Sequence, residues 1–284
     1  YKMDAQAIVA DAKETLTALI ESLDGYKTAY TTEIADAKKE WNAIVDEYYS
    51  TELEGGLNQT LALGIINEFM SEGDIALGSA GSLPGDMQRL FRPNGTRTYH
   101  MEYGYSNMGY EVNGALGAKL AKPEAEVYTF CGDGSFLMGH SELYTAIQEG
   151  LKINICLFDN LGWGCIENLQ NNQGTDTFGT VFRARNPKTG MLDGDEIAVD
   201  FAKIAEGYGA KAYSIRTSAE LKSALEDAKK QDRPVLFDIK VLPKTMTPGF
   251  ESWWRVGVAE VSKSKRVAEA YDDMQKHIAQ TFDY

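Results

Sequence analysis

The chain is poor in the residues that build disulfide frameworks and thiolate metal clusters. Its 284 residues include three cysteines and three histidines. The cysteines, Cys131, Cys156 and Cys165, are odd in number and form no Cys-x-x-Cys pair. We interpret them as small core side chains in a reducing compartment, the cytoplasm, with a reactive role at Cys165 as the minor alternative.

Positive charge is also scarce, because 28 lysines and arginines face 42 aspartates and glutamates, for a net charge of −14. This balance argues against nucleic acid or an anionic membrane as a partner. No apolar run approaches the roughly 20 residues of a membrane span. An anionic ligand would therefore need local devices to hold it, such as a metal ion and backbone N–H groups.

The first fifty residues contain helices but no sheet for them to cover. A short strand is expected at 6–9, a helix after an Asp11–Glu14 capping-box signal, and a second helix at about 32–48. The chain opens without an initiator methionine or a signal peptide, so we expect that it begins inside a longer protein. We therefore assign 1–50 to the end of a preceding domain, 51–56 to a linker and 57–284 to the main domain.

From residue 57 onward, helical and strand patterns alternate. The expected helices are 61–70, 110–120, 141–149, 199–208, 219–230 and 258–281, and the expected strands are 74–78, 126–130, 153–158, 211–215 and 235–241. A Gly- and Asn-rich loop is expected at 162–190. Apolar, β-branched strands alternating with helices predict an α/β fold, in which a doubly wound, mostly parallel sheet is covered on both faces.

Two polar residues follow two of these strands directly. Asp133 lies in a Gly-Asp-Gly, and Asn160 follows it by 27 residues (160 − 133), each after a β-type run. Such a βαβ unit places both residues at the carboxyl edge of a parallel sheet. A carboxylate, an amide oxygen and a loop carbonyl, here that of Gly162, are hard ligands suited to Mg²⁺. Each residue alone is commonly a turn residue, and it is the joint spacing that favours a metal site.

The spacing resembles the signature of thiamine-diphosphate (ThDP) enzymes. A third element of that signature, Gly104 to Gly109, places Met108 25 residues before Asp133 (133 − 108). The resemblance implies that Met108 wedges under the cofactor, that the Ser106 carbonyl accepts from its aminopyrimidine, and that Asp133, Asn160 and Gly162 hold Mg²⁺. The diphosphate of the cofactor would lie against Gly132, Gly134 and Ser135, where free N–H groups favour an anion. Without the joint spacing, we would interpret Met108 as an ordinary core methionine.

Within the ThDP enzymes, the chain resembles the trihydroxycyclohexanedione hydrolases of myo-inositol catabolism. The similar stretches are 99–106, 158–160 with 164–166, and 251–257. The match covers only the latter part of those enzymes, and Asn107 and Trp163 depart from the pattern near the pocket. The resemblance implies ThDP- and Mg²⁺-dependent hydrolysis of a C–C bond, in which a polyol-derived cyclic 1,2-dione opens to a 5-deoxyuronic acid.

Other residues are candidates for handling protons and substrate. His100 and Glu102 precede the cofactor loop and are the candidate acid–base residues, although a lone histidine is more often structural. Trp253, Trp254 and Arg255 form a candidate substrate lid, since indoles stack on sugar-like rings and arginine binds carboxylates, with simple packing as the alternative. Of the remaining histidines, His140 is expected to cap or pack, and His277 to face solvent.

The ThDP family activates its cofactor with a glutamate in a separate pyrimidine-binding domain, which this sequence lacks. The resemblance therefore implies that a missing N-terminal portion or another chain completes the site, in a homodimer or homotetramer. An acetolactate-synthase-like carboligase or decarboxylase, or a non-catalytic subunit of the same fold, stays an alternative. Oxoacid:ferredoxin oxidoreductases are disfavoured because three scattered cysteines do not suit an iron–sulfur cluster. A dinucleotide-binding reading fails because the required third glycine is missing.

Overall fold

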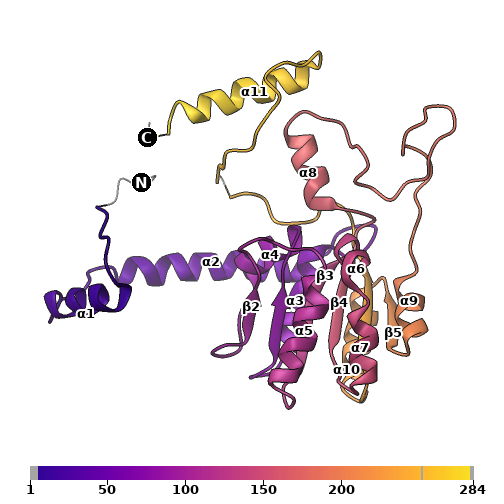
Figure 1. Cartoon of the computed structure of the whole chain (residues 1–284), viewed down its shortest axis with the longest axis horizontal. Coiled ribbons are helices and arrows are strands. Elements are labelled where there is room, and N and C mark those ends of the chain that lie inside the picture. The colour runs from indigo at the N-terminus through magenta and orange to yellow at the C-terminus, as the bar shows by residue number, and fades with distance from the viewer. Residues whose placement is uncertain (1–5, 251, 282–284) are drawn as a thin grey trace. The chain divides into compact units, whose positions relative to one another are not determined.

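The computed structural model describes residues 6–250 and 252–281 of the chain (Figure 1). By its internal contacts the chain divides into two compact units, the first made of residues 1–44 and 254–284 and the second of residues 45–253. The domain assignment made from the sequence, with boundaries at residues 50 and 57, stays a prediction. Among the residues that the structure describes, no helix is both long and apolar enough to cross a membrane.

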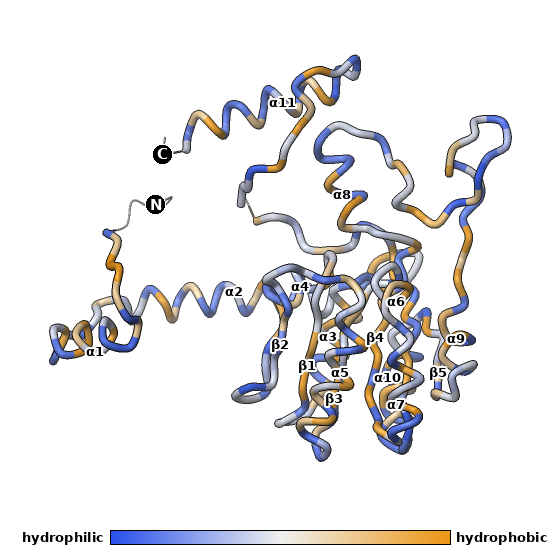
Figure 2. The backbone as a smooth tube through the Cα atoms, in the orientation of Figure 1, coloured by the Kyte–Doolittle hydropathy of each residue, from blue (hydrophilic) through white to orange (hydrophobic). Residues whose placement is uncertain are grey.

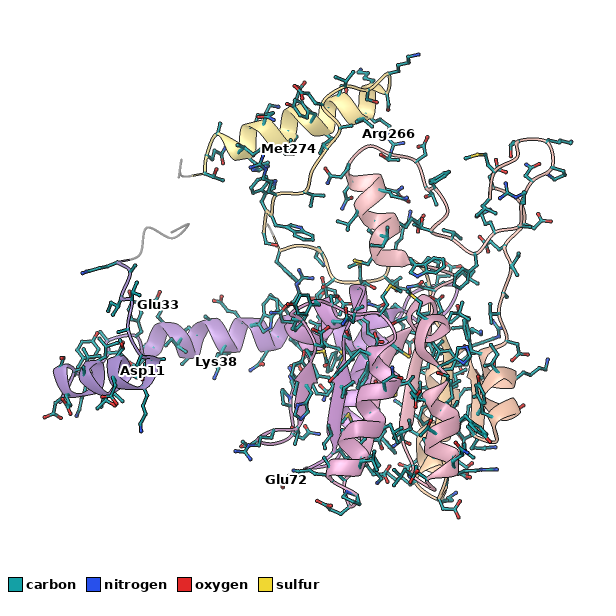
Figure 3. The ribbon with its side chains drawn as sticks, in the orientation of Figure 1. Asp11, Glu33, Lys38, Glu72, Arg266 and Met274 are labelled. Carbon is teal, nitrogen blue, oxygen red and sulfur yellow. The ribbon has the colours of Figure 1, made fainter. Side chains whose placement is uncertain are left out.

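The first unit is helical in its described part. It contains α1 (Ala12–Ser22), most of α2 (Thr32–Ser50) and α11 (Lys265–Ile278). Asp11 caps α1, because its carboxylate accepts from the N–H groups of Lys13 and Glu14 at 2.9 and 3.1 Å (Figure 3). The strand expected at residues 6–9 is wrong: this exposed segment has no neighbouring strand to complete a hydrogen-bonded ladder within the described residues.

The second unit is built on a six-stranded sheet in which every pair of neighbouring strands is parallel. Its strand order is β2-β1-β3-β4-β6-β5. The strands are β1 (Ile75–Gly78), β2 (Tyr99–Met101), β3 (Val127–Gly132), β4 (Asn154–Asp159), β5 (Lys211–Ile215) and β6 (Val235–Lys240). The helices are α3 (Gln59–Phe69), α4 (Ser82–Leu90), α5 (Tyr110–Ala121), α6 (Asp133–Gly139), α7 (Glu142–Gln148), α8 (Gly164–Asn172), α9 (Phe201–Tyr208) and α10 (Ser218–Ala228).

Helices cover both faces of this sheet, as the alternation of elements predicts. Helices α5, α7 and α9 pack on one face, and α3, α4 and α10 on the other (Figure 1). The central strands are mostly apolar (Figure 2), and β1 and β4 are buried at every position. Because helices cover both faces of the sheet, side chains on either side of a central strand are buried. These strands therefore have mostly hydrophobic sequences rather than an alternation of polar and apolar residues.

Four elements of the second unit lie outside the predicted pattern. Helix α4 contains Pro84 and Gly85, and α8 is rich in asparagine, so low helix propensity concealed both. Strand β2 has only three residues and lies at the sheet edge, and α6 begins without an intervening loop after β3. In the first unit, α11 begins at Lys265 rather than near residue 258.

The strand order reverses between β1 and β3, since β2 lies on one side of β1 and the later strands lie on the other. In open parallel sheets, ligands bind outside the carboxyl ends of the strands at such a switch point. The residues that follow β1, β2, β3 and β4 at this edge are Ser79, Glu102, Asp133 and Asn160. The topology thus brings together residues that are far apart in the sequence.

Candidate functional site

Asp133 and Asn160 lie next to each other at the carboxyl edge of the sheet. Strands β3 and β4 are paired with Gly132 opposite Phe158, so Asp133 is level with Asp159 and Asn160 follows one residue later. The Oδ2 atom of Asp133 accepts from the N–H groups of Asn160 at 3.1 Å and Gly162 at 2.9 Å. The three residues predicted to hold a metal therefore form one cluster, although their role as ligands stays a prediction.

The side chain of Asn160 carries an acceptor that the described residues leave unused. Its Oδ1 atom is buried and has no hydrogen-bond partner among them. Buried polar atoms in folded proteins are almost always paired, and an exception calls for an explanation such as a missing ion. A hard cation bound between this oxygen and the Asp133 carboxylate would satisfy it. The donor set therefore fits a magnesium ion.

The loop after Asn160 has an unusual backbone. Leu161 adopts a left-handed conformation with φ 67°, and a Cβ atom at Gly162 would overlap the carbonyl oxygen of Thr180. Only glycine fits at residue 162, because the N–H of Trp163 and the carbonyl of Thr180 form a 2.8 Å hydrogen bond beside it. Strained conformations of this kind concentrate at ligand sites, where the surrounding structure holds them in place.

The carboxylate of Asp133 is 1% exposed. Burial raises its pKa to about 8, and the neighbouring Asp159 adds to the increase, while the N–H groups of Gly162 and Gly134 oppose it. A divalent cation at this carboxylate would favour its ionised form. A metal ion bound here would therefore oppose the increase in the pKa of Asp133 that burial causes.

A buried network of charged residues lies next to Asp133, and it was not predicted from the sequence. Lys240, at the end of β6, contacts Asp159 at 2.5 Å and Asp238 at 2.8 Å. Burial lowers the pKa of Lys240, but its contacts with the two carboxylates outweigh burial, so the pKa of Lys240 is raised. A signal was present, because Asp238 and Lys240 are the only charged residues in an otherwise apolar strand. Sequence alone does not place this strand beside β4.

The segment predicted to receive the diphosphate is the first turn of α6. The N–H of Gly134 donates to the Oδ1 atom of Asp133 at 2.6 Å. The Ser135 hydroxyl donates to Glu111 at 2.7 Å and accepts from the N–H of Gly109 at 2.8 Å. A Cβ atom at Gly134 would lie 2.5 Å from the Nε1 atom of Trp163, so the indole packs directly on this backbone. Only a residue without a side chain permits that contact.

The loop between β2 and α5 carries the other predicted cofactor contacts. Ser106 is exposed with φ 53°, and Met108 is half-buried just before Gly109, which caps α5. The Glu102 carboxylate accepts from the N–H groups of Tyr105 at 3.0 Å and Asn107 at 2.9 Å. Glu102 therefore holds this loop in its shape.

Those hydrogen bonds also affect the chemistry open to Glu102. The N–H of Tyr105, followed by that of Asn107, lowers the pKa of its carboxyl group, so it is ionised and a poor proton donor at neutral pH. His100 is exposed, with its Nε2 atom 3.1 Å from the carbonyl oxygen of Arg97. The catalytic roles of both residues stay predictions.

The remaining candidates are spread over the chain. Trp253 and Trp254 fall on opposite sides of the boundary between the two units and are 39% and 68% exposed, and their contact with a substrate stays a prediction, as does that of Arg255. His140 packs: its ring stacks on Phe136 and its Nδ1 atom is 3.1 Å from the Tyr208 hydroxyl.

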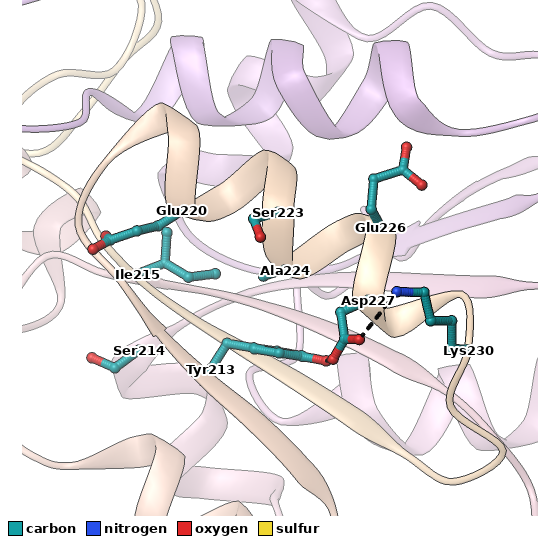
Figure 4. Close-up of a pocket in the computed structure, with 9 residues that line it drawn as sticks. All are labelled: Tyr213, Ser214, Ile215, Glu220, Ser223, Ala224, Glu226, Asp227 and Lys230. Carbon is teal, nitrogen blue, oxygen red and sulfur yellow. Dashed lines mark hydrogen bonds and ion pairs between the residues drawn. The ribbon is translucent and has the colours of Figure 1, made fainter.

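A surface cavity of about 520 Å³ lies between β5 and α10 (Figure 4). Three of its polar residues contact each other, since Asp227 accepts from the Tyr213 hydroxyl at 2.7 Å and pairs with Lys230 at 3.6 Å. None of its lining residues is among the predicted site residues.

In the described part of the chain, no three histidine, cysteine or acidic side chains form a metal cluster, so the candidate metal site depends on an amide and a backbone carbonyl beside one carboxylate.

Comparison with known families agrees with this geometry. Residues 79–239, more than half of the chain, match the family described as thiamine pyrophosphate enzyme, C-terminal TPP binding domain. The chain therefore belongs to the thiamine pyrophosphate (thiamine diphosphate) enzyme family. The matched region begins just after β1 and ends in β6, and it contains Met108, Asp133 and Asn160.

Two curated relatives give a more specific comparison than the family as a whole. The chain is 50% identical to the 3D-(3,5/4)-trihydroxycyclohexane-1,2-dione hydrolases of Geobacillus thermodenitrificans and Bacillus thuringiensis, over 98% and 100% of its own length. The match covers 47% and 48% of those proteins, so the chain spans about half the length of the curated relatives it matches.

A solved structure supports the fold. The thiamine diphosphate-dependent 4-hydroxybenzoylformate decarboxylase of Rhodococcus jostii RHA1 superposes with a TM-score of 0.57 at 22% identity, over 68% of this chain and 34% of that one. At this identity the likeness concerns the fold alone.

Proposed function

We propose that this chain is the diphosphate- and metal-binding half of an enzyme that hydrolyses a C–C bond in 3D-(3,5/4)-trihydroxycyclohexane-1,2-dione, in inositol catabolism. The observation that carries the proposal is the 50% identity to hydrolases of that name over essentially the whole chain. The unpaired Asn160 oxygen beside the buried Asp133 carboxylate supports a working cofactor site rather than a relic of one.

Magnesium is the metal we assign to the site. Asp133 and Asn160 would supply a carboxylate and an amide oxygen, and Gly162 its backbone carbonyl. Mg²⁺ prefers oxygen ligands and usually completes its shell with water and substrate phosphates, which suits a site offering three protein ligands. The diphosphate would lie against Gly132, Gly134 and Ser135, and the aminopyrimidine against Ser106 and Met108.

The proposed reaction adds one water across a C–C bond. Bound thiamine diphosphate would supply a carbanion equivalent and an electron sink for the broken bond. The hydroxyl group of water ends on the neighbouring carbonyl carbon as a carboxylate, and a proton ends on the other carbon as an aldehyde. No oxidant or reductant is needed. His100 and Glu102 would orient the substrate hydroxyls, and the Trp253–Arg255 segment would cover the ring.

The proposal includes a second component. The activating glutamate of the family lies in a pyrimidine-binding domain, which we assign to an N-terminal portion or to another chain, within a homodimer or homotetramer in the cytoplasm. An acetolactate-synthase-like carboligase is the second candidate, because it would use the same metal motif. The segment 253–255, which resembles the hydrolases, favours hydrolysis.

A complementation assay tests the proposal. The chain is combined with the N-terminal half of the Geobacillus relative, ThDP and Mg²⁺, and the dione is followed by NMR. We expect one linear product with a carboxylate and an aldehyde. Two separate fragments, or condensation of added pyruvate without ring opening, would contradict the hydrolase assignment.

Asp133→Asn provides the control for the metal site. We expect it to lower the rate by more than about 100-fold, since even outer-shell partners of metal ligands are worth 10–100-fold. Asp232→Asn removes an exposed carboxylate elsewhere on the surface and should leave the rate unchanged. If the Asp133 variant were as active as the wild-type chain, the reaction would not depend on a metal ion held by Asp133.

A further inference from the structure

The buried carboxylate of Glu111 has no part in the proposed chemistry. Glu111 lies in the first turn of α5, where a glutamate would ordinarily face solvent, yet it is 1% exposed. A buried charged group requires partners that replace water, and each of its partners contributes to the shape of the site.

Three hydrogen-bond donors from three chain segments meet at this carboxylate. Its Oε1 atom accepts from the N–H of Ala80 at 3.2 Å, in the turn after β1. Its Oε2 atom accepts from the N–H of Gly109 at 3.0 Å and from the Ser135 hydroxyl at 2.7 Å. Gly109 directly follows Met108, and Ser135 is two residues beyond Asp133. Glu111 therefore joins the loop predicted to hold the aminopyrimidine to the turn predicted to hold the diphosphate.

The same two segments touch at a second point. A Cβ atom at Gly139 would lie 2.5 Å from the carbonyl oxygen of Gly109, so the loop before α5 rests directly on the backbone at the end of α6. The Ser79 hydroxyl also donates to the carbonyl of Asn107 at 2.8 Å, which ties the loop to the turn after β1. The loop is thus fixed from both sides, and among the described residues the Glu111 side chain forms hydrogen bonds to all three segments.

We propose that Glu111 is a positioning residue that fixes the distance between the two cofactor-binding loops and so selects the complete, bent cofactor over its diphosphate tail alone. This inference rests on the proposed function. Its chemical basis is that all three groups facing the side chain are donors, which an ionised carboxylate, an acceptor only, can satisfy together. Glutamine has the same shape, but its NH₂ group would face one of these donors.

Two probes separate positioning from simple affinity. Mg²⁺–ThDP spans both loops, whereas Mg²⁺–pyrophosphate reaches only the turn at Asp133–Ser135. We expect the wild-type chain, combined with the N-terminal half of the Geobacillus relative, to bind both by titration calorimetry. Glu111→Gln should weaken Mg²⁺–ThDP about tenfold, the size expected from the loss of a hydrogen bond to a charged group, and Mg²⁺–pyrophosphate by less than about twofold.

Glu220→Gln is the matched control. Glu220 also lies in the first turn of a helix and accepts backbone N–H groups, but these belong to Arg216 and Thr217, outside both loops. Binding of both probes by this variant should stay within about twofold of wild type. If Glu111→Gln does not fold, Glu111→Asp, which keeps the charge on a shorter side chain, supplies the same comparison.

The outcomes are distinct. Equal weakening of both probes would overturn the inference, because it would assign Glu111 to the diphosphate turn alone, and no weakening of either would overturn it as well. If the wild-type chain combined with the N-terminal half of the Geobacillus relative binds neither probe, the proposed function fails and the inference with it. Selective loss of Mg²⁺–ThDP supports both.

Discussion

The Oδ2 atom of Asp133 accepts the backbone N–H of Asn160 at 3.1 Å, although 27 residues separate the two in the sequence (160 − 133). The hydrogen bond fixes the carboxylate without occupying the Asn160 side chain, whose Oδ1 atom remains unpaired among the described residues. The site is thus organised before any ligand arrives. An acceptor left unpaired in the free protein reduces its stability and is explained if a ligand uses it.

Replacement of Asn160 by leucine tests this trade between stability and binding. Removing a buried, unpaired acceptor should leave the free energy of unfolding unchanged or raise it by about 1 kcal/mol. Stabilisation by ThDP and Mg²⁺ together, measured as a shift in melting temperature, should disappear. Asn160→Asp keeps an oxygen ligand and should retain the shift. A clear loss of stability in the leucine variant without ligand would indicate that the amide is structural.

The close approach of α6 to the loop before α5 leads to a second prediction. In Gly139→Ala, the new Cβ atom meets backbone atoms of Gly109 that have no room to move, so we expect a loss of about 1–3 kcal/mol, as for other overpacked sites. Gly117→Ala, in the exposed interior of α5 with open space at its Cβ position, should instead gain up to about 1 kcal/mol. Urea denaturation measures both, and a gain at both positions would contradict the contact.

Much of the second unit could be predicted because its strands are buried on both faces. Mostly apolar runs marked β3 and β4, and the residue directly after each strand, Asp133 or Asn160, could then be assigned to one edge of a parallel sheet. That reasoning requires only local patterns and a topological rule. The resemblance to ThDP enzymes rested on the same residues.

The supporting shell of the site could not be predicted, because it depends on pairing between distant strands. Lys240 reaches Asp159 through the pairing of β4 with β6, across 81 residues. Glu111 resembles any glutamate in a helix's first turn, and only the packing of α5 on α6 shows that it is buried. The prediction of a strand at 6–9 was wrong for a related reason. A strand needs a neighbouring strand, and the local sequence does not reveal whether one is present.

Tyr49 anchors the end of α2 in the second unit. Its hydroxyl donates to the Oδ1 atom of Asn67 and to the carbonyl of Leu90, both at 2.8 Å, and its ring packs on the backbone of Gly64. Tyr49→Phe should reduce the free energy of unfolding by about 1–3 kcal/mol, because buried acceptors lose their donor. Tyr26→Phe, at a 69% exposed side chain, should change it by less than about 0.5 kcal/mol. Equal stabilities for the two variants would mean that water replaces the hydroxyl.

Asp86 gives a prediction for the dependence of stability on pH. Its carboxylate is fully buried and accepts from the Thr247 hydroxyl at 2.6 Å and from the Gln59 amide at 2.7 Å. Burial raises the pKa of this carboxyl group, although the hydrogen bonds from Thr247 and Gln59 oppose the increase. Between the unfolded pKa of about 3.9 and the raised folded pKa, the folded protein binds more protons than the unfolded chain.

The free energy of unfolding should therefore fall as pH rises through that window, by at most about 1.4 kcal/mol per pH unit from this one group, and level off above the folded pKa. Asp86→Asn cannot ionise, and its amide can keep both partners if the side chain of Gln59 turns over. This variant should lack that part of the slope and be more stable than wild type above the window. Urea denaturation at a series of pH values measures the difference, with Asp232→Asn, at an exposed position, as the control that should keep the wild-type slope. Parallel curves for Asp86→Asn and wild type would show that Asp86 titrates alike in the folded and unfolded chains.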